Sequence, residues 1–151
     1  MIKNCGISRC NQLEYLELGA NVDSLTYGAF SGVDSLKVLI SWAATPPRCN
    51  EYSTAFRPKP QDLKAVLYVP KASLEAYSTA PDWMNFNTIV PIEDVGDING
   101  DGKINIADVT ALINILLGAE TERTPYCDVN LDGKISILDV TALINILLNN
   151  P

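Results

Sequence analysis

Hydrophobic and polar positions alternate over residues 13–18, which predicts a short strand with one buried side. The pattern returns 23 residues later, because residues 4–16 align on residues 27–39 with leucine on leucine at two positions. A fixed period of this length indicates a repeat architecture in which each unit stacks on the next. The first third of the chain is therefore predicted to be a short stack of strands and loops.

A lid for the open end of this stack is predicted from residues 65–89. Residues 65–69 form an apolar run bounded by Pro70, as expected of a strand. Ser73 is a candidate N-cap of a short helix that Pro81 ends. Terminal repeats need a cover, and the apolar residues expected to supply it are Trp83, Phe86 and Ile89.

The last third of the chain contains a duplicated loop. Residues 97–118 and 128–149 agree at 17 of 22 positions. Each copy opens with oxygen-bearing side chains at loop positions 1, 3 and 5, glycine at position 6 and aspartate at position 12. This spacing wraps six or seven oxygen ligands around a calcium ion, so we expect two Ca²⁺. The expected ligands are Asp97, Asn99, Asp101, the Lys103 carbonyl and Asp108, then Asp128, Asn130, Asp132, the Lys134 carbonyl and Asp139.

Charge is distributed unevenly along the chain. Residues 1–92 carry eight acidic and eight basic residues, whereas residues 93–151 carry ten acidic and three basic residues. The whole net charge of −7 therefore belongs to the second segment. The asymmetry predicts two modules with this boundary. The acidic balance argues against a nucleic acid partner, and the absence of a run of about 18 apolar residues argues against a membrane span.

The helix expected after each loop is apolar on more than one side. One stripe is expected to pack on its own copy, and it contains Val109, Leu112, Ile113 and Leu116, with Val140, Leu143, Ile144 and Leu147. A second face contains Ala107, Ala111 and Ile115, with Leu138, Ala142 and Ile146. A module of this size has too little mass to bury its helices all round. The second face therefore either meets another protein or packs against the rest of the chain.

Two segments resemble known families. Residues 28–32 (Gly-Ala-Phe-Ser-Gly), with the lid that follows, resemble the BspA-like leucine-rich repeats of bacterial surface proteins over residues 1–91. Residues 96–149 contain a calcium loop followed by one helix, twice, and resemble the type I dockerin module. The implied fold class is two modules: a short leucine-rich-repeat solenoid with a C-terminal cap, of α/β character and mostly strand and loop, followed by a small all-α pair of calcium loop-helix units.

The dockerin resemblance implies calcium-dependent docking to a cohesin-type domain of another protein. The residues implied to contact it are Ile106, Ala107, Ile113, Asn114, Ile137, Leu138, Ile144 and Asn145. Most of these are apolar, which implies an apolar partner surface. The repeats are expected to present a surface that recognises a protein or a glycan. The alternative is a purely structural calcium module that covers the repeat domain of a surface adhesin.

Residue types that support catalysis are few, and we expect a non-catalytic binding protein. The chain has no histidine, which excludes Ser-His-Asp and Cys-His mechanisms. Glu14 and Glu17 flank Leu16 and are expected to be solvated. The cysteines match no metal or redox motif, and buried free thiols are expected at Cys5, Cys10, Cys49 and Cys127. The repeat pattern also predicts further repeats upstream. The two resemblances imply an extracellular or bacterial cell-surface location, with a signal peptide upstream.

Overall fold

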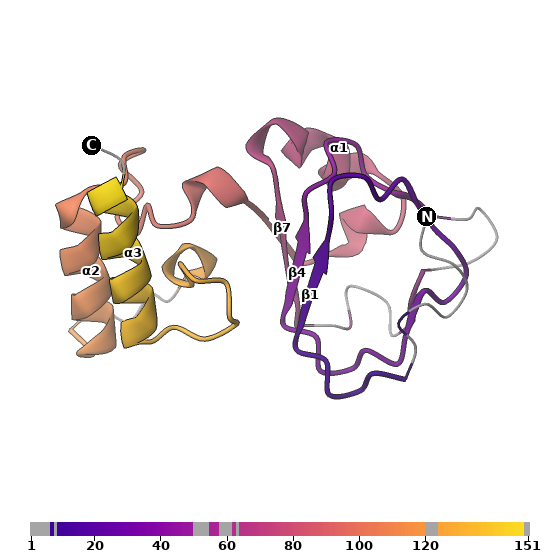
Figure 1. Ribbon diagram of the computed structural model, residues 1–151, viewed down its shortest axis with the longest axis horizontal. Helices are drawn as coiled ribbons and strands as arrows, with labels where there is room; N and C mark the ends of the chain where they lie inside the picture. The colour runs from indigo at the N-terminus through magenta and orange to yellow at the C-terminus, as the bar shows by residue number, and fades with distance from the viewer. Residues whose placement is uncertain are drawn as a thin grey trace. The chain divides into compact units, whose positions relative to one another are not determined.

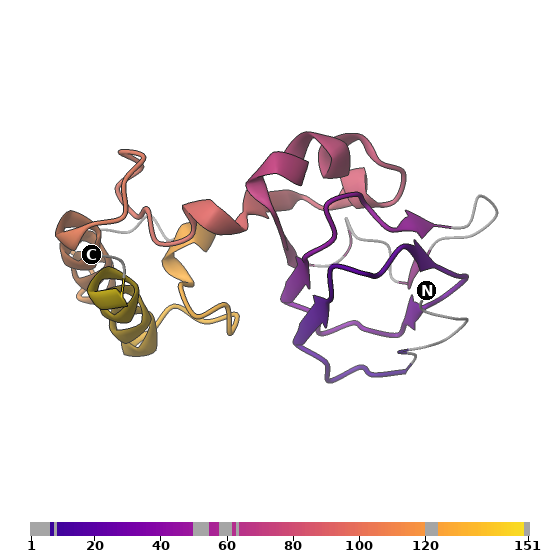
Figure 2. The same ribbon diagram turned by 45° about the horizontal axis from the view of Figure 1, so that its top comes forward.

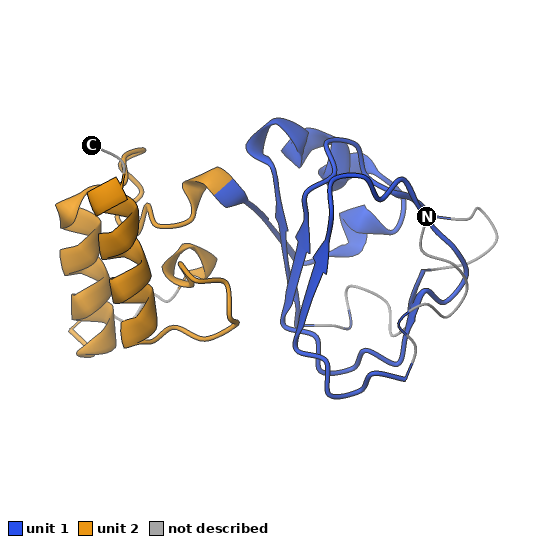
Figure 3. Ribbon diagram, in the orientation of Figure 1, with its two compact units in different colours: residues 1–92 blue, residues 93–151 orange. Residues whose placement is uncertain are grey.

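The computed structural model describes residues 7, 9–49, 55–57, 62, 64–119 and 124–149. The chain forms two compact units, unit 1 (residues 1–92) and unit 2 (residues 93–151), which are coloured separately in Figure 3. Each unit has a buried apolar core of its own.

Unit 1 is a coil of chain whose strands stack in parallel (Figure 1). Its strands are, in chain order, β1 (Tyr15–Leu18), β2 (Ser24–Leu25), β3 (Phe30–Ser31), β4 (Val38–Ser41), β5 (Arg48–Cys49), β6 (Phe56–Arg57), β7 (Val66–Val69) and β8 (Thr88–Pro91). The first three strands pair in parallel with the next three, one by one. β7 then pairs with β4 and β8 with β7, which gives a four-stranded parallel sheet in the order β1-β4-β7-β8.

The register of β1 on β4 reproduces the period found in the sequence. Tyr15 lies opposite Val38 and Leu18 opposite Ser41, an offset of 23 residues. Because successive side chains of a strand point to opposite faces, partners in register share a face. Leu16 and its partner Leu39 both belong to the buried core of unit 1.

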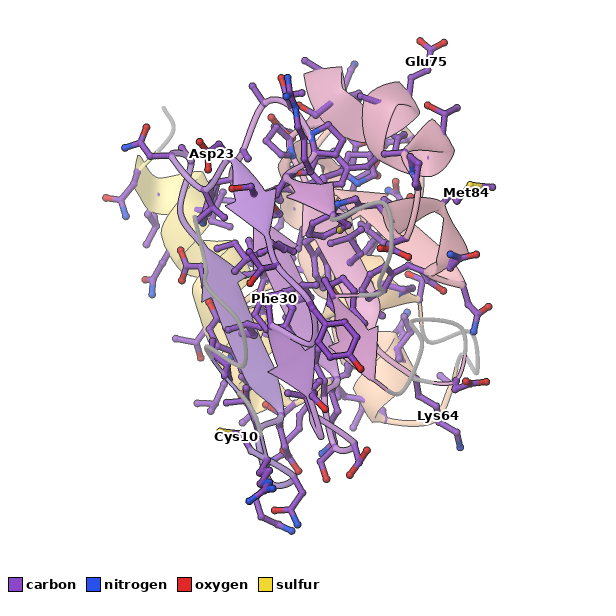
Figure 4. The ribbon with its side chains drawn as sticks, turned by 90° about the vertical axis from the view of Figure 1, so that its right-hand side faces the viewer. Cys10, Asp23, Phe30, Lys64, Glu75 and Met84 are labelled. Atoms are coloured by element: carbon purple, nitrogen blue, oxygen red, sulfur yellow. The ribbon has the colours of Figure 1, made fainter. Side chains whose placement is uncertain are left out.

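Aromatic rings fill much of the interior of unit 1. The ring of Phe56 lies 5.1 Å from Phe30, 5.6 Å from Trp83 and 5.4 Å from Phe86, measured between centroids. The contacts of Phe56 with Trp83 and Phe86 are edge-to-face, and such contacts add to the free energy gained by burial. Figure 4 shows Phe30 inside the unit, whereas Glu75 points outward.

The lid of unit 1 consists of η2 (Lys71–Ser73), α1 (Leu74–Thr79) and η3 (Trp83–Asn85). Ser73 precedes α1, as predicted, but its side chain makes no capping bond. Its hydroxyl instead donates to the Ala44 carbonyl at 2.9 Å. The Tyr77 hydroxyl donates to the Ala43 carbonyl at 3.0 Å, and the Trp83 indole N–H donates to the Pro47 carbonyl at 2.9 Å. The lid thus holds the turn after β4 through three side chains.

We expect Tyr77→Phe to destabilise unit 1. The Tyr77 hydroxyl is buried, and its oxygen lies 2.7 Å from the hydroxyl oxygen of the buried Ser41. Removal of the phenolic oxygen leaves the Ser41 hydroxyl and the Ala43 carbonyl without this partner. We expect the free energy of unfolding to fall by about 1–3 kcal/mol. Urea unfolding followed by tryptophan fluorescence measures the stability of unit 1, because both tryptophans lie in that unit. The matched control is Tyr27→Phe at a tyrosine that is 43% exposed. Equal unfolding midpoints for the two variants would contradict the assignment.

Unit 2 begins within η4 (Ile92–Asp94), whose first residue belongs to unit 1. Its other helices are α2 (Ile106–Leu116), η5 (Pro125–Cys127) and α3 (Ile137–Asn149). Figures 1 and 2 both show α2 and α3 side by side. The buried core of unit 2 consists of Val109, Leu112, Ile115, Cys127, Val129, Val140 and Leu143.

The predicted packing stripe of these helices is wrong at two positions. Ile113 is 38% exposed and Ile144 is 40% exposed, whereas Ile115, assigned to the second face, is buried. The loop residues Ile104 and Ile135 pack against the core. The loops therefore contribute to the core, and the buried face of each helix is turned toward them.

The fold class predicted from the sequence is wrong for this chain. A mostly strand-and-loop solenoid followed by an all-α pair was expected, but the structure has mixed α/β content with three α-helices and a parallel sheet. Ile89, expected in the lid, lies in β8, which pairs in parallel with β7 at the edge of the sheet. In unit 2 the two helices comprise only 11 and 13 residues, and loops account for much of the rest.

The cysteines lie in different environments. Cys127 is a buried free thiol and Cys49 a half-buried one, but Cys10 is exposed, and Cys5 lies outside the described residues. The prediction of buried thiols is therefore correct for Cys127 and wrong for Cys10. Burial raises the pKa of Cys49 to about 12, so this thiol stays protonated at neutral pH. Within the described residues, no helix is long and apolar enough to cross a membrane.

Candidate metal centre and exposed helix face

The first duplicated loop is closed by hydrogen bonds to its own carboxylates. The Asp97 carboxylate accepts from the backbone N–H groups of Asp101 (3.1 Å) and Gly102 (2.9 Å). The side-chain oxygen of Asn99 accepts from the Asp101 N–H at 2.9 Å, and Asp101 accepts from the Lys103 N–H at 2.9 Å. The side chains at loop positions 1, 3 and 5 are therefore all oriented by the backbone they enclose.

The second loop repeats these four hydrogen bonds. Asp128 accepts from the N–H groups of Asp132 (3.0 Å) and Gly133 (2.9 Å). Asn130 accepts from the Asp132 N–H at 3.0 Å, and Asp132 accepts from the Lys134 N–H at 2.8 Å. Glycine stands at position 6 of both loops with φ of 80° and 82°, a left-handed conformation that glycine adopts without steric cost. Local spacing therefore determines the same geometry twice.

The aspartates at position 12 are fully buried. Asp108 accepts from the N–H groups of Asn105 (2.8 Å), Ile98 (2.9 Å) and Asn99 (3.1 Å). Asp139 accepts from the N–H groups of Ser136 (2.7 Å) and Asn130 (3.2 Å). Each aspartate thus ties the start of its loop to the first turn of the helix that follows.

Sequence reasoning missed the helix-capping role of position 9. Asn105 and Ser136 are the N-caps of α2 and α3, and their oxygens accept from the N–H groups of Ala107 (2.8 Å) and Leu138 (3.1 Å). The signal was present as Asn-x-x-Asp and Ser-x-x-Asp, a variant of the capping box. The Asp108 carboxylate accepts a hydrogen bond from the Asn105 N–H. The same aspartate therefore closes the first loop and caps the N-terminus of α2.

The loop residues suit a hard cation by their chemistry, although their carboxylates are turned toward backbone N–H groups. Among the described residues, no three Asp, Glu or Cys side chains gather in a group that could hold a metal ion. Asp108 and Asp139 are 0% exposed, and no described Lys or Arg forms an ion pair with them. Buried carboxylates need compensation by a partner charge or by hydrogen bonds. An oxygen-only donor set suits Ca²⁺ better than softer metals, so these residues fit that ion.

Electrostatic repulsion is visible within the second loop. Burial, with a smaller contribution from the negative charges of Asp139 and Asp132, raises the pKa of Asp128 to about 6, although hydrogen bonds from the N–H groups of Gly133 and Asp132 oppose the rise. The other two carboxylates of this loop therefore disfavour a negative charge on Asp128.

Position 4 is the main difference between the loops, and it supports a direct test. Leu131 adopts φ of 56°, whereas its counterpart Gly100 adopts φ of 72°. A left-handed conformation costs a residue with Cβ about 1–2 kcal/mol, partly offset by the lower chain entropy of leucine in the unfolded state. We expect Leu131→Gly to stabilise unit 2 by about 0.5–1 kcal/mol and Gly100→Leu to destabilise it. Thermal unfolding followed at 222 nm measures both, and equal shifts in one direction would contradict the account.

The exposed sides of α2 and α3 carry several large apolar side chains and no charged one. The most exposed of these are Ile106 (70%), Leu117 (79%), Ile137 (66%), Leu138 (58%) and Leu148 (75%). Ala107, Ile113, Ile144 and Asn145 are also exposed, and Asn114 is half-buried. The only acidic residues of the two helices, Asp108 and Asp139, are buried. All eight residues expected to contact a partner therefore lie at least partly in solvent.

The family model described as the dockerin type I domain matches residues 95–148. The prediction of a dockerin module is thereby confirmed for this segment, which contains both loops, α2 and all but the last residue of α3. The match does not include residues 1–91, so it gives no support to the resemblance to BspA-like repeats. No curated protein and no solved structure matches the chain.

Proposed function

We propose that unit 2 is a calcium-dependent docking module that attaches this chain to a cohesin-type domain on another protein. The observation that carries the proposal is the duplicated loop, with its oxygen spacing and hydrogen-bond pattern repeated inside the segment that matches the dockerin model. Two Ca²⁺ would be bound, one by each loop, through the ligands named from the sequence.

Calcium would supply positive charge where buried carboxylates now rely on N–H dipoles. In the first loop Asp97, Asp101 and Asp108 would share one ion, and the second loop offers the equivalent three aspartates. Position 12 contributes to both loop and helix cap, so an ion held there would couple loop closure to helix formation.

The exposed faces of α2 and α3 are the proposed contact surface. Their residues are Ile106, Ala107, Ile113 and Asn114, with Ile137, Leu138, Ile144 and Asn145. A charge-free apolar face of this kind is the part of a small module that a partner buries. We infer a cohesin-type partner with an apolar rather than a charged surface.

Under this proposal, docking of unit 2 attaches unit 1 to the protein that carries the cohesin-type domain. We infer a non-catalytic role for it and an extracellular or cell-surface location. Glu14 pairs with Lys37 at 2.8 Å, and Glu17 accepts hydrogen bonds from Tyr15 and Trp42, so both glutamates have structural partners.

Size-exclusion chromatography of the full chain with a panel of cohesin domains tests the docking. We expect a one-to-one complex in millimolar CaCl₂ that dissociates in excess EGTA. The matched control is Asp34→Ala, which removes an exposed aspartate outside unit 2 and should leave the complex intact. If calcium raises the melting temperature of the chain but no cohesin in the panel binds it, the module is a structural cap instead.

A further inference from the structure

The two loops differ in the residue that follows the asparagine at position 3. Asn99 is followed by Gly100 in the first loop, whereas Asn130 is followed by Leu131 in the second. Both asparagines are exposed. Asparagine before glycine is the dipeptide most prone to spontaneous deamidation, because the glycine nitrogen reaches the side-chain amide without obstruction by a Cβ. The difference therefore singles out one of two otherwise matched loops.

The two asparagine side chains have the same surroundings. The Asn99 side-chain oxygen accepts from the Asp101 N–H at 2.9 Å, and its NH₂ group donates to the Asp101 carboxylate at 3.3 Å. The Asn130 side chain makes the same two bonds with Asp132, at 3.0 Å and 3.3 Å. In both loops the N–H donor polarises the amide carbonyl, which makes its carbon more electrophilic. These contacts favour neither asparagine, so the residue that follows decides the reactivity.

Gly100 leaves the reacting nitrogen open. It is exposed, it adopts φ of 72°, and the place where a Cβ would stand is empty space. Leu131 is half-buried and carries a branched side chain on the carbon next to the corresponding nitrogen. Steric hindrance of the attack therefore falls on the second loop alone. The difference is covalent, so it persists whether a loop is folded or open.

We propose that Asn99 is a modification site that converts spontaneously to isoaspartate when the first loop holds no calcium. The Gly100 nitrogen attacks the side-chain carbonyl carbon of Asn99, a C–N bond forms, and the bond to the NH₂ group breaks. That group leaves as ammonia with the proton of the Gly100 N–H, and the product is a five-membered succinimide ring. Water then opens the ring. Hydrolysis of the bond to the side-chain carbon gives aspartate, and hydrolysis of the bond to the main-chain carbon gives isoaspartate.

The proposal rests on the calcium binding inferred for unit 2, because the ion would protect this site. While the Asn99 oxygen ligates an ion, its amide cannot rotate onto the Gly100 nitrogen. An ion that binds only the closed loop lowers the population of the open, reactive loop.

Isoaspartate at position 3 would damage the first loop selectively. It routes the main chain through the former side-chain carbon, so one methylene group enters the backbone between Asn99 and Gly100. The ligands at positions 1, 3 and 5 then lose the spacing that a calcium loop requires. The second loop would keep its asparagine and its ion, and unit 2 would retain one Ca²⁺ of two.

Incubation of the full chain at physiological temperature, in EGTA or in millimolar CaCl₂, tests the site when it is followed by tryptic digestion and tandem mass spectrometry. Trypsin places the two asparagines on separate peptides, residues 72–103 and 124–134. In EGTA we expect Asn99 to exchange ammonia for water about tenfold faster than Asn130. In CaCl₂ the conversion of Asn99 should slow. Labelling by an isoaspartyl methyltransferase identifies the isoaspartate.

Matched variants exchange this property between the loops. Leu131→Gly should make Asn130 convert as fast as Asn99. Asn99→Gln should abolish conversion in the first loop, because glutamine would have to close a larger ring. After ageing in EGTA and return to CaCl₂, the natural chain should bind one Ca²⁺ in native mass spectrometry. Asn99→Asp, which has the charge of the product without the extra backbone atom, should bind two, since aspartate suits position 3.

Equal conversion of Asn99 and Asn130 in EGTA would overturn the proposal, as would an unchanged rate at Asn130 in Leu131→Gly. Equal rates at Asn99 in CaCl₂ and EGTA would overturn it too if native mass spectrometry shows both ions bound in CaCl₂. Fast conversion of Asn99 in a chain that binds no Ca²⁺ at all would support the modification site and would count against the calcium module alone.

Discussion

Removal of calcium is expected to unfold unit 2 and to leave unit 1 folded. Each bound ion contributes about 4 kcal/mol when its free concentration is a thousandfold above the dissociation constant. Small domains have a total stability on the order of 0.05–0.15 kcal/mol per residue. Two ions would therefore contribute as much as the whole stability of a unit of this size, and the buried carboxylates Asp108 and Asp139 would lose their compensating charge.

The chain carries separate probes for its two units. Both tryptophans, Trp42 and Trp83, lie in unit 1, whereas α2 and α3 supply 11 and 13 residues of helix against 6 in α1. Addition of EGTA should therefore reduce the far-UV ellipticity at 222 nm strongly and change tryptophan emission little. Mg²⁺ serves as the control ion and should not restore the signal. An ellipticity that EGTA leaves unchanged would refute calcium-coupled folding.

The same ions can be counted loop by loop. Asp97→Ala and Asp128→Ala each remove position 1 of one loop, so native mass spectrometry should find one bound Ca²⁺ in each variant and none in the double variant. Asp34→Ala should retain two ions. A count of two in either single variant would show that position 1 is not a ligand.

A second large effect is expected on the exposed helix face, where the two copies differ. Position 11 of the loop is Ala107 in the first copy and Leu138 in the second, and Leu138 is 58% exposed. A buried leucine offers more apolar area than alanine, a difference of roughly 1–2 kcal/mol. The duplication makes two orientations of a partner possible, and we expect the partner to prefer the side that contains Leu138. Leu138→Asp should thus weaken binding by about five- to thirtyfold more than Ala107→Asp.

Titration calorimetry of both variants against the cohesin that binds in chromatography measures this difference. A parallel calcium titration must show two ions in each variant, since both substitutions lie one residue before a proposed ligand at position 12. Equal losses of affinity would contradict the preferred orientation. No loss from either substitution would mean that this face does not contact the partner.

Local sequence spacing predicted the loops well and the helix packing less well. The hydrogen bonds of Asp97 and Asp128 to positions 5 and 6 follow from residues close together in the chain, where spacing constrains geometry directly. Ile113 and Ile144 were assigned to the packed stripe but are exposed. A helix that is apolar on several sides leaves its rotation undetermined. The loop residues packed against the core, Ile104 and Ile135 among them, select one rotation.

The sequence by itself determined the features that depend on close neighbours in the chain or on an internal repeat. These are the 23-residue offset between β1 and β4, the turn at position 6 of each loop and the segment that matches the dockerin model. Tertiary structure alone decided the addition of β8 to the sheet and the bonds from Ser73 and Tyr77 to the turn after β4. These features join residues about 20 to 35 positions apart, and no local propensity or period encodes which distant backbone groups will meet.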